Sequence, residues 1–135
     1  SRHEALRSVF VTKEGEAEVH LLACEHGLPL RRIDLHDEPI KGSGAGVELG
    51  RLCTEEARAP FDLTRGPLIR ACLIRVPAAS SADEHVLLLT QHHIISDGWS
   101  LGILLSELSA LYTAFSNNQA SPLSPLAIQY PDYAA

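Results

Sequence analysis

The chain has 135 residues, of which 45% are hydrophobic, and this is enough for one domain with a core of its own. Seventeen acidic against eleven basic residues give a formal charge of -6, so the sequence lacks the basic footprint of a protein that binds nucleic acid or anionic membranes. Three cysteines without a CxxC pair argue against a disulfide framework or a zinc ribbon, and we expect them to be reduced and mostly buried in a soluble, cytoplasmic protein.

The first half of the chain predicts a short helix, a hairpin, a strand and a longer helix. Apolar residues in "SRHEALRSVF" follow helical spacing and predict a helix through about residue 9. Glu14-Gly15 lies between two segments of partial alternation and predicts a hairpin turn. The stretch "LPLRRIDL" predicts a short strand, followed by a loop rich in Gly and Pro over residues 39–46. Apolar positions from Val47 to Ala59 share one helical face, and Pro60 ends that helix.

The second half predicts a turn, a long hairpin and a helix. "FDLTRGP" is typical of a turn, and the apolar runs "LIRACLIRV" and "HVLLLTQHHI" predict two strands of an antiparallel hairpin joined by "PAASSADE". Ser100 is expected to cap a helix that runs to about Phe115, because the following Leu, Tyr and Phe residues are spaced at three and four. The prolines of "SNNQASPLSPLAIQYP" then predict a loop.

Two adjacent histidines end the second strand of the hairpin. If the strand persisted to residue 93, His92 and His93 would point to opposite faces of the sheet. The residues alone leave three interpretations open: structural hydrogen-bonding histidines, a two-His metal site with Asp97 as carboxylate ligand, or general acid/base chemistry. Opposed side-chain directions disfavour the metal site, whereas Gly98 favours acid/base chemistry because it leaves backbone room for a substrate.

Four segments resemble the condensation domains of nonribosomal peptide synthetases. "HHIISDG" within "QHHIISDGWSLG" matches their HHxxxDG signature, and "RHEALRSVF" is similar to their RHExLRTxF motif. "YPDYA" resembles YxDFAVW, and "FDLTRGPLIRACLIRV" resembles the run that precedes the histidine strand. The segments follow the family's order over nearly the whole chain, with Ser8 in place of Thr, Gln91 in place of Met and Tyr133 in place of Phe.

The resemblance implies an α/β fold with two lobes, each a chloramphenicol acetyltransferase-like sandwich, and an active site between them. Residues 1–135 are expected to be a partial condensation domain that holds most of the N-terminal lobe only. The family's first motif, of the SxAQxRLW kind, and the motifs of the C-terminal lobe are absent from the sequence. We therefore expect the isolated segment to be inactive.

The resemblance also implies the reaction, which is amide bond formation during nonribosomal peptide synthesis. The donor is an aminoacyl or peptidyl thioester and the acceptor is an aminoacyl amine, both carried on phosphopantetheine arms of upstream and downstream peptidyl carrier proteins. Adjacent synthetase domains are further expected partners, and no cofactor or metal is expected to be bound by the domain itself. The alternatives are an O-acyltransferase with the shorter HxxxDG pattern, a related epimerising domain, or a non-catalytic lobe that docks a carrier protein.

The resemblance assigns His93 as the catalytic residue, either as general base or as a group that positions the amine. His92 is expected to pack and hydrogen-bond on the other side. Asp97 could orient His93 as in a triad, but by resemblance it forms a structural ion pair, with Arg2 the first candidate and Arg7 the second; the isolated segment is not expected to complete this ion-pair environment.

Two further residues of the motif have expected roles. Gly98 is expected to keep the route to the catalytic histidine open, and its N-H could donate to an oxyanion. Trp99 is expected to be a packed aromatic at the start of the helix. No chemistry is assigned to the "YPDYA" segment.

Overall fold

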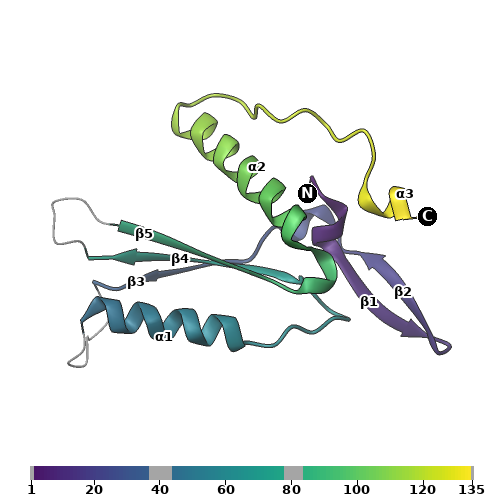
Figure 1. Cartoon of the computed structure of the whole chain (residues 1–135), viewed down its shortest axis with the longest axis horizontal. Coiled ribbons are helices and arrows are strands. Elements are labelled where there is room, and N and C mark those ends of the chain that lie inside the picture. The colour runs from purple at the N-terminus through teal and green to yellow at the C-terminus, as the bar shows by residue number, and fades with distance from the viewer. Residues whose placement is uncertain (1, 37–43, 78–83, 135) are drawn as a thin grey trace.

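The computed structural model describes residues 2–36, 44–77 and 84–134. Figure 1 shows a three-stranded sheet with a long helix on each side and a separate hairpin beyond one end. In chain order the elements are the 3-10 turn η1 (Glu4–Arg7), strands β1 (Ser8–Lys13) and β2 (Glu16–Leu21), turn η2 (Cys24–His26), strand β3 (Leu30–Asp34), helix α1 (Ala45–Arg58), strands β4 (Ile69–Val76) and β5 (Glu84–Gln91), turn η3 (His93–Ile95), helix α2 (Gly98–Ser116) and helix α3 (Tyr130–Ala134).

Strands β1 and β2 form the predicted hairpin, whereas the helix predicted before it is only the short turn η1. The strands pair antiparallel from Ser8↔Leu21 to Lys13↔Glu16. Glu14 and Gly15 both have positive φ, 53° and 89°, as a two-residue hairpin turn requires. The helix prediction is wrong for residues 8 and 9, because pairing with β2 favours the extended backbone there over the helical spacing of a short apolar run.

The main sheet has the order β3-β4-β5, with β4 in the centre. The predicted long hairpin is confirmed, since β4 and β5 pair antiparallel from Ile69↔Gln91 to Val76↔Glu84. Its connecting loop lies mostly outside the described residues. The predicted strand in "LPLRRIDL" is also confirmed as β3, which pairs parallel with β4. Parallel neighbours need a crossover connection, and α1 provides it.

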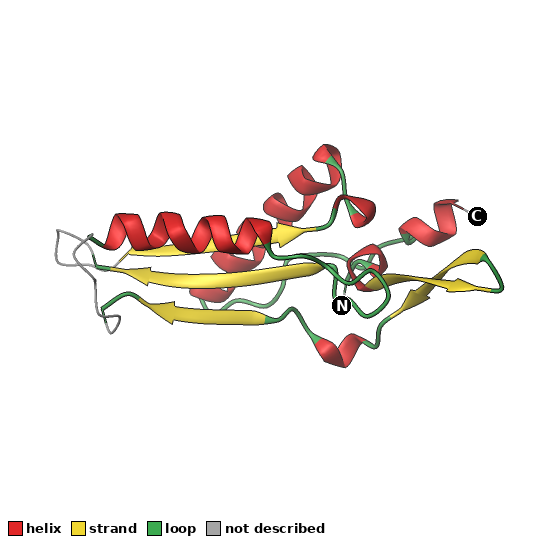
Figure 2. Ribbon diagram, turned by 90° about the horizontal axis from the view of Figure 1, so that it is seen from below, coloured by secondary structure: helices red, strands yellow, loops and turns green. Residues whose placement is uncertain are grey.

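One face of the sheet is covered by α1, which lies along the strands in Figure 2. Leu52 of this helix packs with Leu35, Cys72 and Ile74 in a buried cluster. The predicted helix is confirmed, and it ends at Arg58, two residues before Pro60. The Gly- and Pro-rich loop predicted before it lies largely outside the described residues.

A second cluster joins the hairpin to the far end of the main sheet. Its buried members are Leu68, Ile69 and Ile95, and partly buried Phe10 and Phe61 pack against them. Gly66 precedes β4 with φ 53°, and a Cβ at this position would lie 2.6 Å from Cγ1 of Val9. Glycine therefore permits the close approach of β1 to the turn that leads into β4.

Helix α2 is confirmed in extent, but its predicted cap and its packing are different. The N-cap residue is Asp97, and Ser100 is the third helical residue of a capping box. The helix leaves the sheet at an angle (Figure 1), and Ala114 is its buried residue among those described. Trp99 is 82% exposed, so the prediction of a packed aromatic is wrong for this structure. None of the described helices is both long and apolar enough to cross a bilayer.

The cysteines and the C-terminal segment also depart in part from expectation. Cys72 is buried and Cys53 half-buried, but Cys24 is exposed, so the expectation of mostly buried thiols fails at this residue. The proline-containing stretch after α2 lacks regular structure as predicted, and the short helix α3 that follows it was not predicted.

Candidate active site

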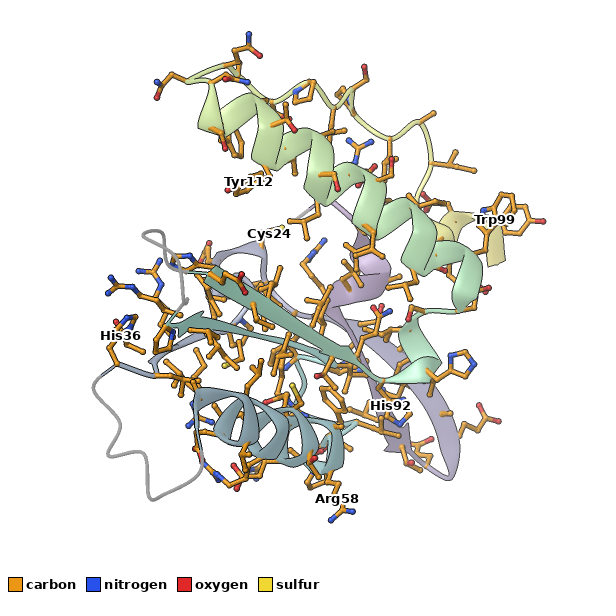
Figure 3. All side chains as sticks on the ribbon, turned by 60° about the vertical axis from the view of Figure 1, so that its left-hand side comes forward. Cys24, His36, Arg58, His92, Trp99 and Tyr112 are labelled. Carbon is orange, nitrogen blue, oxygen red and sulfur yellow. The ribbon has the colours of Figure 1, made fainter. Side chains whose placement is uncertain are left out.

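Residues 92–97 link the end of β5 to the start of α2, and Figure 3 places His92 at this junction. β5 ends at Gln91, although the backbone N-H of His92 still donates to the carbonyl of Leu68 at 2.9 Å. The chain then forms turn η3, which Ile95 anchors in the second cluster. The alternation of side chains along a strand therefore does not extend to His93, and the direction of its ring is set by the turn.

His92 acts as a cap for this turn. Its Nδ1 accepts a hydrogen bond from the backbone N-H of Ile94 at 3.1 Å. Because a backbone N-H can only donate, the lone pair of the neutral ring is on Nδ1 and its proton is on Nε2. The basic nitrogen of His92 is thus already occupied inside the protein.

His93 has the opposite arrangement. Its Nδ1 lies 2.7 Å from the carbonyl oxygen of Ser96. A carbonyl can only accept, so Nδ1 carries the proton and the lone pair of the neutral ring is on Nε2. The side chain is exposed. His93 can therefore take up a proton on Nε2 without breaking the hydrogen bond that orients the ring.

Asp97 holds the first turn of α2. Its carboxylate accepts hydrogen bonds from the backbone N-H of Ser100, at 2.8 Å, and from the Ser100 hydroxyl. These side-chain and backbone hydrogen bonds lower the pKa of Asp97 below its usual value. The carboxylate stabilises the start of the helix, and among the described contacts it has none with His93, so the triad interpretation finds no support.

Gly98 is the first residue of α2 and is exposed. A Cβ built on it would meet no atom within 4 Å. The packing of this chain does not itself require glycine at this position. The space beside the first turn of α2 is therefore open to a ligand that approaches the histidines.

Among the described residues Asp97 has no arginine partner. The isolated segment is not expected to complete this ion pair, so the pairing of Asp97 with Arg2 stays a prediction for the full-length protein. In this structure Arg2 has other partners. Its Nε donates to Oε1 of Glu107 at 2.9 Å, and its Nη1 donates to the carbonyl of Ser124. Glu107 lies ten residues beyond Asp97 on α2, about 15 Å along the helix axis. Arg7, the second candidate, donates instead to the carbonyl of Leu22.

Neither of two cavities in the described structure includes the histidines. One, of about 160 Å³, lies between α1 and the sheet. The other, of about 70 Å³, lies between η1, the segment around η2 and the start of β4. Within the described ranges, no group of three His, Cys, Asp or Glu side chains is arranged as metal ligands would be. His93 thus lies on an open surface.

A family model for the condensation domain matches residues 1–135. The chain belongs to the condensation domain family. Malpinin synthetase of Mortierella alpina is 54% identical to this condensation domain chain over all 135 residues, which are 2% of that protein's length. The shared sequence confirms the resemblance that the motifs indicate.

Two solved structures are similar to the condensation domain chain over 98% of its length. One is the epimerization domain from the third module of tyrocidine synthetase B, with a TM-score of 0.74, 26% identity and 28% of that chain covered. The other is the X-domain in its complex with OxyB from teicoplanin biosynthesis, with a TM-score of 0.75, 30% identity and 26% of that chain covered. The predicted fold class, an α/β structure of the chloramphenicol acetyltransferase-like kind, is confirmed.

Sequence reasoning missed several groups at this condensation domain site. The carbonyls of Leu68 and Ser96 have no signal in a sequence, because every residue has a carbonyl. Glu107 does have a signal in the sequence, since it is the only charged residue in the apolar helix from Gly98 to Ser116. A single charge in such a helix indicates a buried or half-buried partner.

Proposed function

We propose that the protein containing this chain forms amide bonds in nonribosomal peptide synthesis, between a donor thioester and an acceptor amine carried by two peptidyl carrier proteins on phosphopantetheine arms. Membership in the condensation domain family supports the reaction class. The single observation that carries the assignment of His93 is the hydrogen bond from its Nδ1 to the Ser96 carbonyl, which leaves the Nε2 lone pair free.

In the proposed reaction His93 is the general base. The amine nitrogen attacks the thioester carbonyl carbon, and a proton of the amine passes to Nε2 of His93. The tetrahedral intermediate then collapses, the carbon-sulfur bond breaks, and the thiolate of the donor arm takes the proton from the imidazolium. Such a base contributes about 10² to 10⁴ in rate. The bond to Ser96 is retained throughout, so the ring keeps its orientation.

The other motif residues support this reaction without touching the reacting atoms. His92 caps the turn that presents His93, and Asp97 caps α2. Gly98 leaves open the space through which the thioester arrives. Arg2 ties the N-terminal segment to α2 through Glu107. We further propose that residues 1–135 are most of one lobe and do not catalyse condensation alone; product from the isolated segment would refute this.

The first experiment follows dipeptidyl thioester on the acceptor carrier by mass spectrometry, using the full-length protein and loaded carriers. His93→Ala should lower the rate about 10²-fold or more. His85→Ala is the matched control, because His85 is an exposed histidine of β5, the strand that leads to the histidine turn, and it should leave the rate unchanged. Equal rates for wild type and His93→Ala would exclude the base role. No product with active carriers would exclude condensation.

A second candidate function is a docking lobe without catalysis. The observation that favours it is the similarity to an X-domain whose solved complex contains OxyB. In that case a partner protein would bind the wild type and His93→Ala equally well, and no turnover would depend on His93. A hydroxyl acceptor that replaces the amine in the same assay tests the O-acyltransferase alternative, and inversion of the donor's Cα configuration tests epimerisation.

A further inference from the structure

Arg70 of β4 ties the sheet to the C-terminal end of α1. Its Nε donates to Oε1 of Glu56 at 2.8 Å. The remaining guanidinium nitrogens donate to backbone carbonyls at the end of the helix, those of Pro60 at 2.9 Å, Ala59 at 3.0 Å and Glu56 at 3.3 Å. A helix end leaves carbonyls without intrahelical partners, and a planar guanidinium with several donors satisfies them in a fixed geometry. The guanidinium of Arg70 is therefore held in place by a rigid frame.

The same guanidinium lies over an aromatic ring that contacts the site. The Arg70 Cζ is 3.8 Å from the centroid of the Phe61 ring. The ring of Phe61 in turn meets the imidazole of His92 with centroids 6.0 Å apart and planes at 89°. Both distances are within the range of favourable cation-aromatic and edge-to-face contacts. Arg70, Phe61 and His92 thus form a continuous stack, which we call the Arg70 stack.

The Arg70 stack ends at the turn that presents His93. The His92 ring must keep its Nδ1 toward the N-H of Ile94 to cap this turn. Phe61 limits rotation of the His92 ring because it occupies the space beside it. The conformation of turn η3 then sets the distance between Nδ1 of His93 and the Ser96 carbonyl.

We propose that Phe61 and Arg70 are positioning residues for His93 that act through His92. This inference rests on the proposed function of His93 as the base. The segment "FDLTRGPLIR", which runs into β4, would then place the Phe61 ring against His92 and the Arg70 guanidinium over that ring. Phe61 touches no reacting atom, and its effect is on the orientation of the base.

The first test measures the reactivity of each imidazole and needs no turnover. Diethyl pyrocarbonate acylates an imidazole nitrogen that has a free lone pair; the N-C bond forms, and ethyl carbonate leaves. In the full-length wild type, peptide mapping by mass spectrometry should find His93 modified faster than His92, because the Nδ1 lone pair of His92 is engaged by Ile94. Phe61→Leu should free the His92 ring and reduce the difference several-fold.

The matched control is Phe10→Leu. Phe10 packs against the same buried cluster as Phe61, and no ring contact with His92 is recorded for it in the described structure. The two substitutions remove the same atoms from the same cluster, so a general loss of packing should affect both alike. Phe61→Tyr retains the aromatic ring and should restore the wild-type pattern. Arg70→Met removes the guanidinium and should act in the same direction as Phe61→Leu.

The second test measures peptide bond formation. Phe61→Leu should lower kcat about 10-fold or more with KM unchanged, because a small misplacement of a catalytic group lowers the rate while substrate binding persists. Phe10→Leu should leave kcat unchanged. Equal losses of kcat in the two variants, or a wild-type ratio of His93 to His92 modification in Phe61→Leu, would overturn the proposal. If the histidines of the wild type are modified as expected but no peptide forms, the proposed function is refuted, whereas the positioning of His93 by Phe61 and Arg70 is not.

Discussion

The two long helices of this chain are held in different ways. α1 lies flat on the sheet, where Leu52 packs with side chains as completely buried as Leu35 and Ile74. α2 is the more apolar of the two, yet most of its large hydrophobic residues are exposed, and Leu104 is its contact with the second cluster. α1 is thus secured by burial, and α2 by a small number of specific bonds at its start and middle. The histidine turn lies between these two regions.

This difference indicates which part of the structure holds the histidine turn in place. The turn is attached to the well-packed side through the Leu68 carbonyl and Ile95. It is attached to α2 through the Asp97 cap and through Leu104, which packs against the same cluster as Ile95. Changes near α1 and β4 should therefore affect the histidines more than changes along most of α2.

Ile74→Ala should have the largest effect on stability. The side chain is 0% exposed in the cluster beneath α1, and removal of a buried isoleucine to alanine costs about 2 to 5 kcal/mol. Leu105→Ala on α2 is the control, since Leu105 is 48% exposed and its loss should cost within about 0.5 kcal/mol. Urea denaturation gives both values. Similar costs would show that α2 is packed as well as α1.

Glu107→Gln should cause the second largest loss of stability, because it breaks the charged hydrogen bonds from Arg2 and His3 that hold the middle of α2. We expect a cost of about 1 to 2 kcal/mol, at the low end for charged hydrogen bonds because the Arg2 and His3 side chains are 28% and 26% exposed. Glu55→Gln on α1 removes one of the two carboxylate partners of the exposed Arg51 and should cost less.

The effect of Glu107 also depends on pH. Burial raises its pKa, but the hydrogen bonds from His3 and Arg2 more than offset this, and the pKa lies below its usual value. A carboxyl with a lowered pKa contributes stability above its unfolded pKa and loses it as the pH falls through the folded pKa. The difference between wild type and Glu107→Gln should therefore shrink in acid. A constant difference from neutral to acidic pH would contradict the assigned bonds.

Asp97→Ala should have a smaller effect, limited to the first turn of α2. It removes the acceptor of the Ser100 bonds, whereas Asp97→Asn keeps an effective N-cap and should retain most of the stability. Hydrogen bonds from Ser100 lower the pKa of Asp97, so its contribution is present above the unfolded pKa and lost as the pH falls through the folded pKa. Thermal unfolding followed by circular dichroism measures this. An Asn variant as unstable as Ala would exclude the capping role.

Gln91→Met should have the smallest effect, and in the opposite direction. The Gln91 Oε1 is buried on the side of the sheet opposite α1 and has no hydrogen-bond donor among the described residues. Removal of such an acceptor should be neutral or stabilise by up to about 1 kcal/mol. Gln129→Met should destabilise, since the Gln129 amide bonds Glu4 and Arg2. If both variants destabilise alike in urea, Gln91 has a donor in the full-length protein.

The elements that the sequence predicts well are those whose pattern is local and long. The apolar runs on both sides of residues 78–83 predict β4 and β5, and the spacing of leucines predicts α2. The short run at Val9 and Phe10 fits a helix or a strand, and only pairing with β2 decides between them. Ser100 and Asp97 are both good N-caps, and their reciprocal bonds make Asp97 the cap.

At the site, the motif identifies the residues but not their partners. The resemblance singles out His93 and Arg2, and the structure adds that the ion-pair partner of Arg2 is Glu107, which lies 105 positions away. The orientation of the two imidazoles depends on the backbone N-H of Ile94 and the carbonyl of Ser96. Backbone groups are the same at every position, so no sequence pattern can distinguish these two from the others.

The central position of β4 in the sheet should also determine how slowly its backbone amides exchange with solvent. Its backbone amides are paired on both edges, and Ala71, Cys72 and Ile74 are buried. In heavy water such amides exchange only when the whole unit unfolds, whereas the two-stranded hairpin of β1 and β2 can open by itself. The backbone N-H of His92, at the start of the histidine turn, donates to the carbonyl of Leu68 next to β4. The amide of His92 should therefore take up deuterium more slowly than the amides of the hairpin.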